Sequence, residues 1–248
     1  MADPVLRILQ PANGAKIAGT GDVRLQAQLQ SGSATGLFFK WYSTLNAAAS
    51  SAHPELNAAD HSAAKLDWTT PLDVGTHVIS LSATDRDGND LPSIKGVTRA
   101  GSTGGAPVPA NPAPCVVHRL WATLKTPAAN GATLSRASSL IEARAPSRWA
   151  KKDTIGNYVM DTDYHQLNGI RYRFRFEPSG APDPSKTAEV IPSANALTFF
   201  IADSTPYVRW SGALPGNLAN GPYVLTLFVE SLDGSVGHSV SRTVTLTP

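Results

Sequence analysis

The feature that most constrains this 248-residue chain is an internal repeat. Residues 75–88 (GTHVISLSATDRDG) align without a gap on residues 221–234 (GPYVLTLFVESLDG), at a constant offset of 146 positions. Each copy begins at a glycine and ends in an Asp-Gly pair. Because a repeated stretch of this length marks units that fold alike, the chain is expected to contain two similar domains.

A second, shorter repeated stretch lies near the start of each copy. Residues 11–15 (PANGA) reappear as residues 127–132 (PAANGA), at an offset near 117 positions. The second copy therefore carries about 29 additional residues between its two matching stretches. The same turn residues bound the same span in both halves of the chain.

The repeated stretches predict β-strands, because alternate side chains in them share one character. The inward positions are expected to be His77, Ile79, Leu81 and Ala83 in the first copy, and Tyr223, Leu225, Leu227 and Val229 in the second. Gly75 and Gly221 mark bends that enter these strands. Asp87-Gly88 and Asp233-Gly234 supply turn residues with positive φ after them.

Further strands are predicted on the same grounds. Residues 37–42 (LFFKWY) place Trp41 in the core, and their counterpart, residues 170–176 (IRYRFRF), places Ile170, Tyr172, Phe174 and Phe176 on one face. The other expected strands are residues 5–9, 23–29 and 94–99 in the first domain and residues 116–124, 138–145 and 236–246 in the second. No stretch shows a convincing long helical period, so the class is all-β, with sandwich topology favoured.

A Gly- and Pro-rich stretch at residues 101–114 sets the expected domain boundary. Its first half is rich in glycine, and the prolines of its second half favour an extended spacer. The predicted organisation is a first domain at residues 1–100, a linker at 101–114, and a second domain at 115–248. The second domain carries an inserted loop at about residues 146–168 between its second and third strands.

Composition narrows the class further. Hydrophobic residues make up 42% and charged residues 16%, which is enough for a packed core, and the net charge of +2 gives no bulk argument for nucleic acid. Cys115 is the single cysteine, so no intrachain disulfide forms, and it is interpreted as a small residue at the start of a strand rather than a reactive thiol. No Sec signal peptide and no membrane-spanning run are found, which favours synthesis in the cytoplasm with assembly or non-classical export.

Residues 75–89, together with Trp41-Tyr42-Ser43, resemble the bacterial Ig-like and PKD-like domains of surface and phage proteins. The resemblance implies two immunoglobulin-like antiparallel β-sandwiches in tandem. The second copy departs from the pattern, since Ser231 replaces the Asp85 of the first, and its assignment depends on the internal repeat. What the resemblance implies for function is adhesion, spacing or assembly, and it brings no catalytic residues.

Signatures of enzymes and cofactor sites are missing from the sequence, so no catalytic residue and no cofactor is predicted. Asp85, Asp87 and Asp90 resemble the start of a calcium loop, because alternate carboxylates can converge on one hard cation. The downstream bidentate glutamate of an EF-hand is absent. A hairpin turn rich in Asp, Gly and Asn explains the same residues, and this simpler interpretation is preferred.

The insertion of the second domain contains the residue types of an interface. Trp149, Tyr158 and Tyr164 are aromatic residues on a predicted loop, where partner-binding residues concentrate. Two alternatives stay open: the loop packs its own aromatics on the sandwich, or it binds a partner or a glycan. An acid pair at Asp161 and Asp163 is a weaker alternative for glycoside hydrolysis.

Three arginines occupy the outward face of one predicted strand. Arg171, Arg173 and Arg175 stand about 6.6 Å apart in extended backbone, forming a ridge of like charge. Such a ridge can meet phosphate, an anionic polysaccharide or an acidic protein face. The preferred alternative is a solvated face whose charge is neutralised by carboxylates on neighbouring strands.

The sequence therefore predicts a non-catalytic structural or protein-interaction module, such as a spacer, an adhesin segment or a subunit of a phage- or secretion-type assembly. A protein partner or self-association is expected. The alternative is a carbohydrate-binding accessory protein that uses the aromatic-rich loop. Nucleic acid is not expected as a partner, because no aromatic side chains suited to base stacking accompany the arginine ridge.

Overall fold

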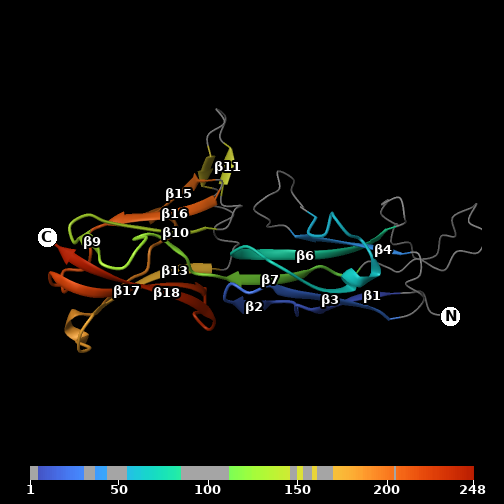
Figure 1. Ribbon diagram of the computed structural model, residues 1–248, viewed down its shortest axis with the longest axis horizontal. Helices are drawn as coiled ribbons and strands as arrows, with labels where there is room; N and C mark the ends of the chain where they lie inside the picture. Colours follow the sequence, from blue (N-terminus) through green and yellow to red (C-terminus); the bar gives the residue numbers. More distant parts are fainter. Residues whose placement is uncertain are drawn as a thin grey trace, which may run out of the picture. The chain divides into compact units, whose positions relative to one another are not determined.

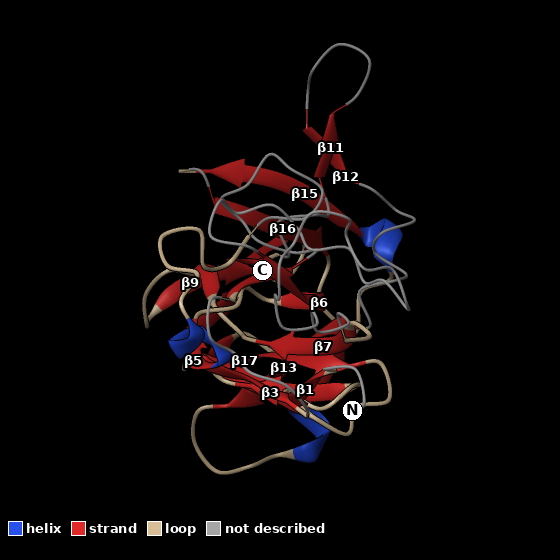
Figure 2. Cartoon of the chain, turned by 90° about the vertical axis from the view of Figure 1, so that its right-hand side faces the viewer, coloured by secondary structure: helices blue, strands red, loops and turns tan. Residues whose placement is uncertain are grey.

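A computed structural model describes residues 5–30, 37–43, 55–84, 112–145, 150–152, 158–160, 170–203 and 205–248. Within these residues the regular elements are strands, together with three short 3-10 helices (Figure 2). The helices are η1 (Ala63–Leu66), η3 (Pro184–Lys186) and η4 (Ala194–Ala196). The predicted all-β class is confirmed.

The chain divides into two compact units. The first comprises Met1–Ala15, Gly21–Leu72 and His77–Val117, and the second comprises Lys16–Thr20, Asp73–Thr76 and His118–Pro248. The division falls inside three strands, between Ala15 and Lys16, between Thr76 and His77, and between Val117 and His118.

Two sheets form the first sandwich. One has the order β1-β3-β5, and the other has the order β2-β7-β6-β4. The strands are β1 (Leu6–Gln10), β2 (Ala15–Ala18), β3 (Val23–Leu29), β4 (Phe38–Ser43), β5 (Asp67–Thr70), β6 (Gly75–Thr84) and β7 (Cys115–Leu120).

Two larger sheets form the second sandwich, with the orders β15-β16-β10-β8 and β14-β13-β17-β18-β9 (Figure 1). The first contains β8 (Leu124–Thr126), β10 (Ser139–Arg144), β15 (Leu197–Ala202) and β16 (Thr205–Gly212). The second contains β9 (Ala132–Ser135), β13 (Ile170–Pro178), β14 (Ala188–Val190), β17 (Gly221–Ser231) and β18 (Gly237–Thr247). Neighbouring strands run antiparallel except β18 and β9, which are parallel.

The inward faces predicted from alternation are confirmed. Every inward position of the two repeated stretches is at most 2% exposed, as is Trp41. The four inward residues of β13 are at most 1% exposed. Gly75, Gly221 and Gly234 have positive φ, as their places at bends and in a turn require.

The core of each sandwich is built around equivalent aromatic residues. Trp41 lies directly opposite Leu81, and Phe174 lies directly opposite Leu227, the residue that aligns with Leu81 in the repeat. Phe174 therefore takes the place of Trp41 in the second sandwich. Trp41 is held further by its indole Nε1–H, which donates to the carbonyl of Lys65 at 2.8 Å.

The repeated Asn-Gly pair makes the same two hydrogen bonds to a strand in both sandwiches, and we call this arrangement the Asn-Gly clamp. In the first, the Asn13 side chain accepts from the backbone N–H of Val116 at 2.8 Å, and the N–H of Gly14 donates to the Val116 carbonyl at 2.7 Å. In the second, Asn130 and Gly131 make the same two bonds to Thr243, at 3.0 and 2.8 Å.

Both glycines of this Asn-Gly clamp have positive φ, 78° for Gly14 and 81° for Gly131. The two bonds satisfy both backbone groups of one residue in the strand that each clamp meets. Val116 in β7 is thus the equivalent of Thr243 in β18.

Most of the predicted boundary between the domains lies outside the described residues. Residues 94–99, expected to close the first domain, and residues 101–111 of the expected linker lie outside the described residues. Residues 116–124, expected to open the second domain, are divided between β7 and β8. The structure places β7 between β2 and β6, in a sheet of the first sandwich.

Replacing Gly131 with alanine is expected to destabilise the second sandwich by about 1 kcal/mol, because a Cβ at positive φ meets the following carbonyl oxygen. Urea denaturation of the full-length chain measures the change. Gly216→Ala is the matched control, since a Cβ there meets no atom within 4 Å and φ is not positive. Equal destabilisation by both substitutions would contradict the role of the clamp.

Candidate functional site

Several residues predicted to form sites lie outside the described residues. They are Trp149, Tyr164, Asp161 and Asp163 of the insertion and the calcium candidates Asp85, Asp87 and Asp90. Those assignments stay predictions. Among the described residues, no three His, Cys, Asp or Glu side chains come together in a group that could hold a metal ion.

Two short strands of the insertion are described. Strands β11 (Ala150–Lys152) and β12 (Tyr158–Met160) pair as an antiparallel hairpin, and Tyr158 is the first residue of β12. This hairpin projects beside β15, the edge strand of its sheet (Figures 1 and 2). The described hairpin of the insertion therefore adjoins that edge of the second sandwich.

The arginine ridge lies on β13, on the outer face of its sheet. Each arginine meets a carboxylate, as the preferred interpretation of the sequence predicts. Glu230 of β17 accepts from Arg171 Nε at 3.0 Å and also pairs with Arg173. Arg173 reaches Glu189 of β14 at 2.6 Å.

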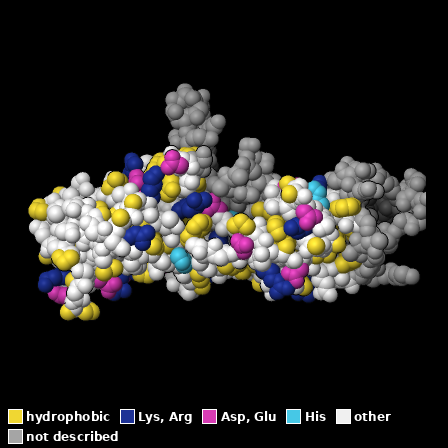
Figure 3. Space-filling model, in the orientation of Figure 1, with side chains coloured by type: hydrophobic (Ala, Val, Ile, Leu, Met, Phe, Trp, Pro, Cys, Tyr) yellow, Lys and Arg dark blue, Asp and Glu magenta, His cyan; other side chains and the backbone are white. Residues whose placement is uncertain are grey.

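The third arginine of the ridge, Arg175, pairs with Glu177 at 2.8 Å. Three arginines thus alternate with three glutamates, and the ridge carries no net charge. Acidic and basic side chains also lie next to one another on the face shown in Figure 3.

Glu230 is the centre of this ion-pair network. Its side chain is 7% exposed, and burial alone would raise the pKa of its carboxyl. Hydrogen bonds from Arg173 and Arg171 outweigh burial and hold the pKa of Glu230 below its usual value. Arg173 also lies over the ring of Phe228, 3.9 Å from its centroid, which fixes the guanidinium in place.

Glu230→Gln is expected to destabilise the protein by about 1.5–3 kcal/mol at pH 7, the usual range for hydrogen bonds to a charged group. Because the folded-state pKa is lowered, the carboxylate's contribution is complete above its unfolded pKa of about 4.3. The contribution disappears as the pH falls through the lower folded pKa.

Denaturation curves from pH 7 down to pH 2 should therefore converge for the wild type and the Glu230→Gln variant. Glu177→Gln, at a carboxylate that is 38% exposed, is the matched control and should change stability by less than about 0.5 kcal/mol. A difference that persists at pH 2 would exclude the ion pairs as its cause.

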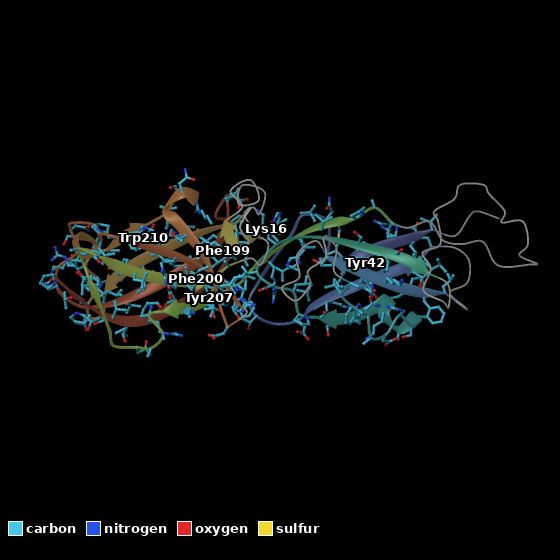
Figure 4. The ribbon with its side chains drawn as sticks, turned by 90° about the horizontal axis from the view of Figure 1, so that it is seen from above. Lys16, Tyr42, Phe199, Phe200, Tyr207 and Trp210 are labelled. Atoms are coloured by element: carbon cyan, nitrogen blue, oxygen red, sulfur yellow. The ribbon has the colours of Figure 1, made fainter. Side chains whose placement is uncertain are left out.

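A second surface, on the outer face of the other sheet, carries aromatic residues that the sequence interpretation missed. Phe200 of β15 and Tyr207 of β16 are directly opposite one another and partly exposed. Their rings are stacked, with centroids 5.6 Å apart and planes at 25° (Figure 4). Phe199 and Trp210 of the same two strands face the core instead and are 6% and 7% exposed.

Cations cover these exposed rings. Lys125 Nζ lies 4.3 Å from the centroid of Tyr207 and 5.2 Å from that of Phe200, and the Arg209 guanidinium lies 4.7 Å from the centroid of Phe200. We call Phe200, Tyr207, Lys125 and Arg209 the aromatic–cationic face. Such contacts keep the long cationic side chains in place above the rings.

One buried carboxylate, directly opposite Arg209 on the neighbouring strand, holds this face together. Glu142 of β10 is 5% exposed and accepts from Arg209 at 2.7 Å and from the Thr126 hydroxyl at 2.6 Å. Burial alone would raise the pKa of Glu142, but the bonds from Thr126 and Arg209 hold it below its usual value. Arg209 forms an ion pair with Glu142, whereas Lys125 attracts the same carboxylate more weakly and forms no ion pair among the described residues.

A sequence signal for this face exists in residues 197–211. Tyr207, Arg209 and Ser211 alternate with Val208 and Trp210, the period of a strand with one polar face. Phe199 and Phe200 are adjacent, so one of the two must point outward in a strand. Which strand pairs with β15, and hence that Phe200 meets Tyr207, depends on the turn at Asp203, whose φ is 50°, and on long-range packing.

A serine–histidine pair in the first sandwich does not form an accessible site. The Ser43 hydroxyl and His77 Nδ1 are 2.8 Å apart, but both residues are 0% exposed. No substrate reaches a pair in this position. It satisfies two polar groups inside the core, and the second sandwich has Tyr223 at the aligned position, with its hydroxyl accepting from the Ala219 N–H at 3.1 Å.

Cys115 agrees with its interpretation as a structural residue. It is the first residue of β7, is 5% exposed, and burial raises the pKa of its thiol.

Among the described residues, no helix has the length and apolar character needed to cross a membrane.

The two sandwiches define the class of the protein. In the second, strands β8-β10-β16-β15 face a sheet built on β13, β17 and β18, the arrangement of immunoglobulin-like domains. Tyr223, near the start of β17, bonds to backbone four residues upstream, as the tyrosine corner of such domains does. The chain is an all-β protein with immunoglobulin-like sandwich folds.

No family model and no curated protein matches the sequence. Among solved structures, the chain is similar to the fibronectin(III)-like modules of Clostridium thermocellum CbhA, with 12% identity, a TM-score of 0.30, and coverage of 98% of this chain and 93% of that one. Titin Ig tandem domains A164-A165 share 8% identity at a TM-score of 0.30, covering 100% of this chain and 99% of that one.

The chicken interferon gamma receptor alpha chain shares 9% identity at a TM-score of 0.34, with the same coverage of 100% and 99%. At these TM-scores the three similarities carry no functional argument. The assignment of the fold depends on the strand order of the chain itself.

Proposed function

We propose that this chain is a non-catalytic interaction module whose second sandwich binds a protein partner through the aromatic–cationic face. The observation that carries the proposal is the stacked, partly exposed pair Phe200–Tyr207 with Lys125 and Arg209 above it. Aromatic and arginine side chains are enriched in the centres of protein interfaces. A cross-strand aromatic pair also stabilises a sheet by about 0.2–1 kcal/mol, which accounts for its packing but not for its exposure.

Charge favours this face over the arginine ridge. On the ridge, three glutamates neutralise Arg171, Arg173 and Arg175, so that an anionic partner would have to displace existing ion pairs. On the aromatic–cationic face, the ammonium of Lys125 lies over the rings, and its attraction to Glu142 is weaker than the ion pair that Arg209 makes with that carboxylate. A partner surface that presents a carboxylate beside an apolar residue would match it.

The double variant Phe200→Ser, Tyr207→Ser is expected to lose at least about 90% of specific binding, since truncating central aromatics commonly costs more than about 2 kcal/mol. Quantitative capture on immobilised full-length chain from its native extract measures binding to other proteins. Sedimentation velocity measures self-association of the same samples. Leu232→Ser, at a 58% exposed residue in the turn between β17 and β18, is the matched control and should bind as the wild type does.

Two results would contradict the proposal. One is equal binding by the double variant and the wild type, with both folded by circular dichroism. The other is a monodisperse monomer that captures nothing from the native extract.

Carbohydrate binding is the second candidate. It is favoured by the position of the β12 backbone, which begins at Tyr158 and lies beside β15, the strand that contains Phe200. A glycan array that stays blank, or glycan binding unchanged by Trp149→Ala, would exclude the insertion as a sugar platform. The cations above Phe200 and Tyr207 cover the ring faces on which a sugar would stack, which favours the protein partner.

A further inference from the structure

Strand β7 occupies a position between two strands that precede it by a long stretch of chain. Its sheet neighbours are β2 and β6, and it follows β6 after 30 residues, 85–114. The Asn-Gly clamp holds Val116 through both of its backbone groups. β7 therefore makes the same hydrogen bonds to the start of the first sandwich as β18, the last strand of the second sandwich, makes to the start of its own.

The inward side chains of β7 complete a core. Cys115 is 5% exposed and Val117 is 0% exposed, whereas Val116 between them is partly exposed. Without β7, the slot between β2 and β6 would present unpaired backbone groups and an open side of the core. Such a slot is a site for one extended strand.

The second sandwich provides an internal comparison. There, β17 and β18 are equivalent neighbours joined by five residues, 232–236. The probability of loop closure falls as about the 3/2 power of length, so a 30-residue connection closes about fifteenfold less readily than a five-residue one. The position of β7 in the sheet therefore depends more on its non-covalent contacts with β2 and β6 than on its covalent connection to β6.

We infer that β2 and β6 form a strand-acceptor site whose partner is β7 of this chain. The Gly- and Pro-rich segment then connects two strands of one sheet rather than two domains. The first sandwich takes its last strand from beyond that segment. Its N-terminal part and the rest of the chain form a complementary pair that holds together without the connecting peptide.

Cleavage of the connection tests this inference in the full-length protein. A recognition site for a specific protease is inserted between Gly104 and Gly105, and the cleaved chain is examined by size-exclusion chromatography with light scattering. The two fragments are expected to elute together at the mass of the intact chain. Separation of the fragments in native buffer would overturn the inference and would support a linker between independent domains.

A matched pair of substitutions separates strand capture from any other association of the fragments. Val117→Thr places a hydroxyl on the buried side of β7, and Val116→Thr makes the same change on its outer side. In the cleaved protein, Val117→Thr should weaken the fragment complex at least about fivefold, since burying an unpaired hydroxyl costs about 1–3 kcal/mol. Val116→Thr should leave the dissociation constant within about twofold, because surface changes are small.

Equal dissociation constants for the two cleaved variants would overturn strand capture even if the fragments elute together. A third variant, Asn13→Ala, removes the side-chain bond to the Val116 N–H from the acceptor side. It should also weaken the complex, by about threefold to tenfold.

Discussion

The arrangement of both sandwiches depends on one small constraint, an Asn-Gly clamp that joins the start of each sandwich to its last strand. The asparagine accepts from a strand N–H and the glycine, at positive φ, donates to the carbonyl of the same residue. Only glycine adopts this backbone conformation without steric cost. The clamp joins segments more than 100 residues apart and so ties the start of each sandwich to its last described strand.

Electrostatics distinguishes the two outer faces of the second sandwich. On β13 and its neighbours, arginines and glutamates alternate in a neutral network centred on Glu230. On β15 and β16, Lys125 lies over the aromatic pair, and Glu142 forms an ion pair with Arg209 while it attracts Lys125 more weakly. Paired charges are already satisfied and gain little from a partner, whereas a cation on an exposed aromatic surface still has an electrostatic interaction to make. This contrast is the physical basis for proposing the second face as the binding surface.

Much of the fold was predictable from the sequence because the relevant signals are local. Alternation identified the buried faces of β6, β13 and β17, and the glycines marked their bends. The neutralisation of the arginine ridge was also anticipated, since a strand of like charges inside a sheet requires opposite charges next to it. The aromatic–cationic face was missed because Phe200 and Tyr207 become neighbours only when β15 and β16 pair in one particular register.

The sequence by itself determined the strand period, the turns and the inward residues. Each of these follows from side chains within a few positions of one another, where the two-residue period of extended backbone acts directly. Only the tertiary structure decided that β7 lies between β2 and β6 and which carboxylate meets which arginine. Pairing between strands far apart in the chain depends on core shape and on shared backbone hydrogen bonds, and a Gly- and Pro-rich segment looks the same in sequence whether it joins two domains or two neighbouring strands.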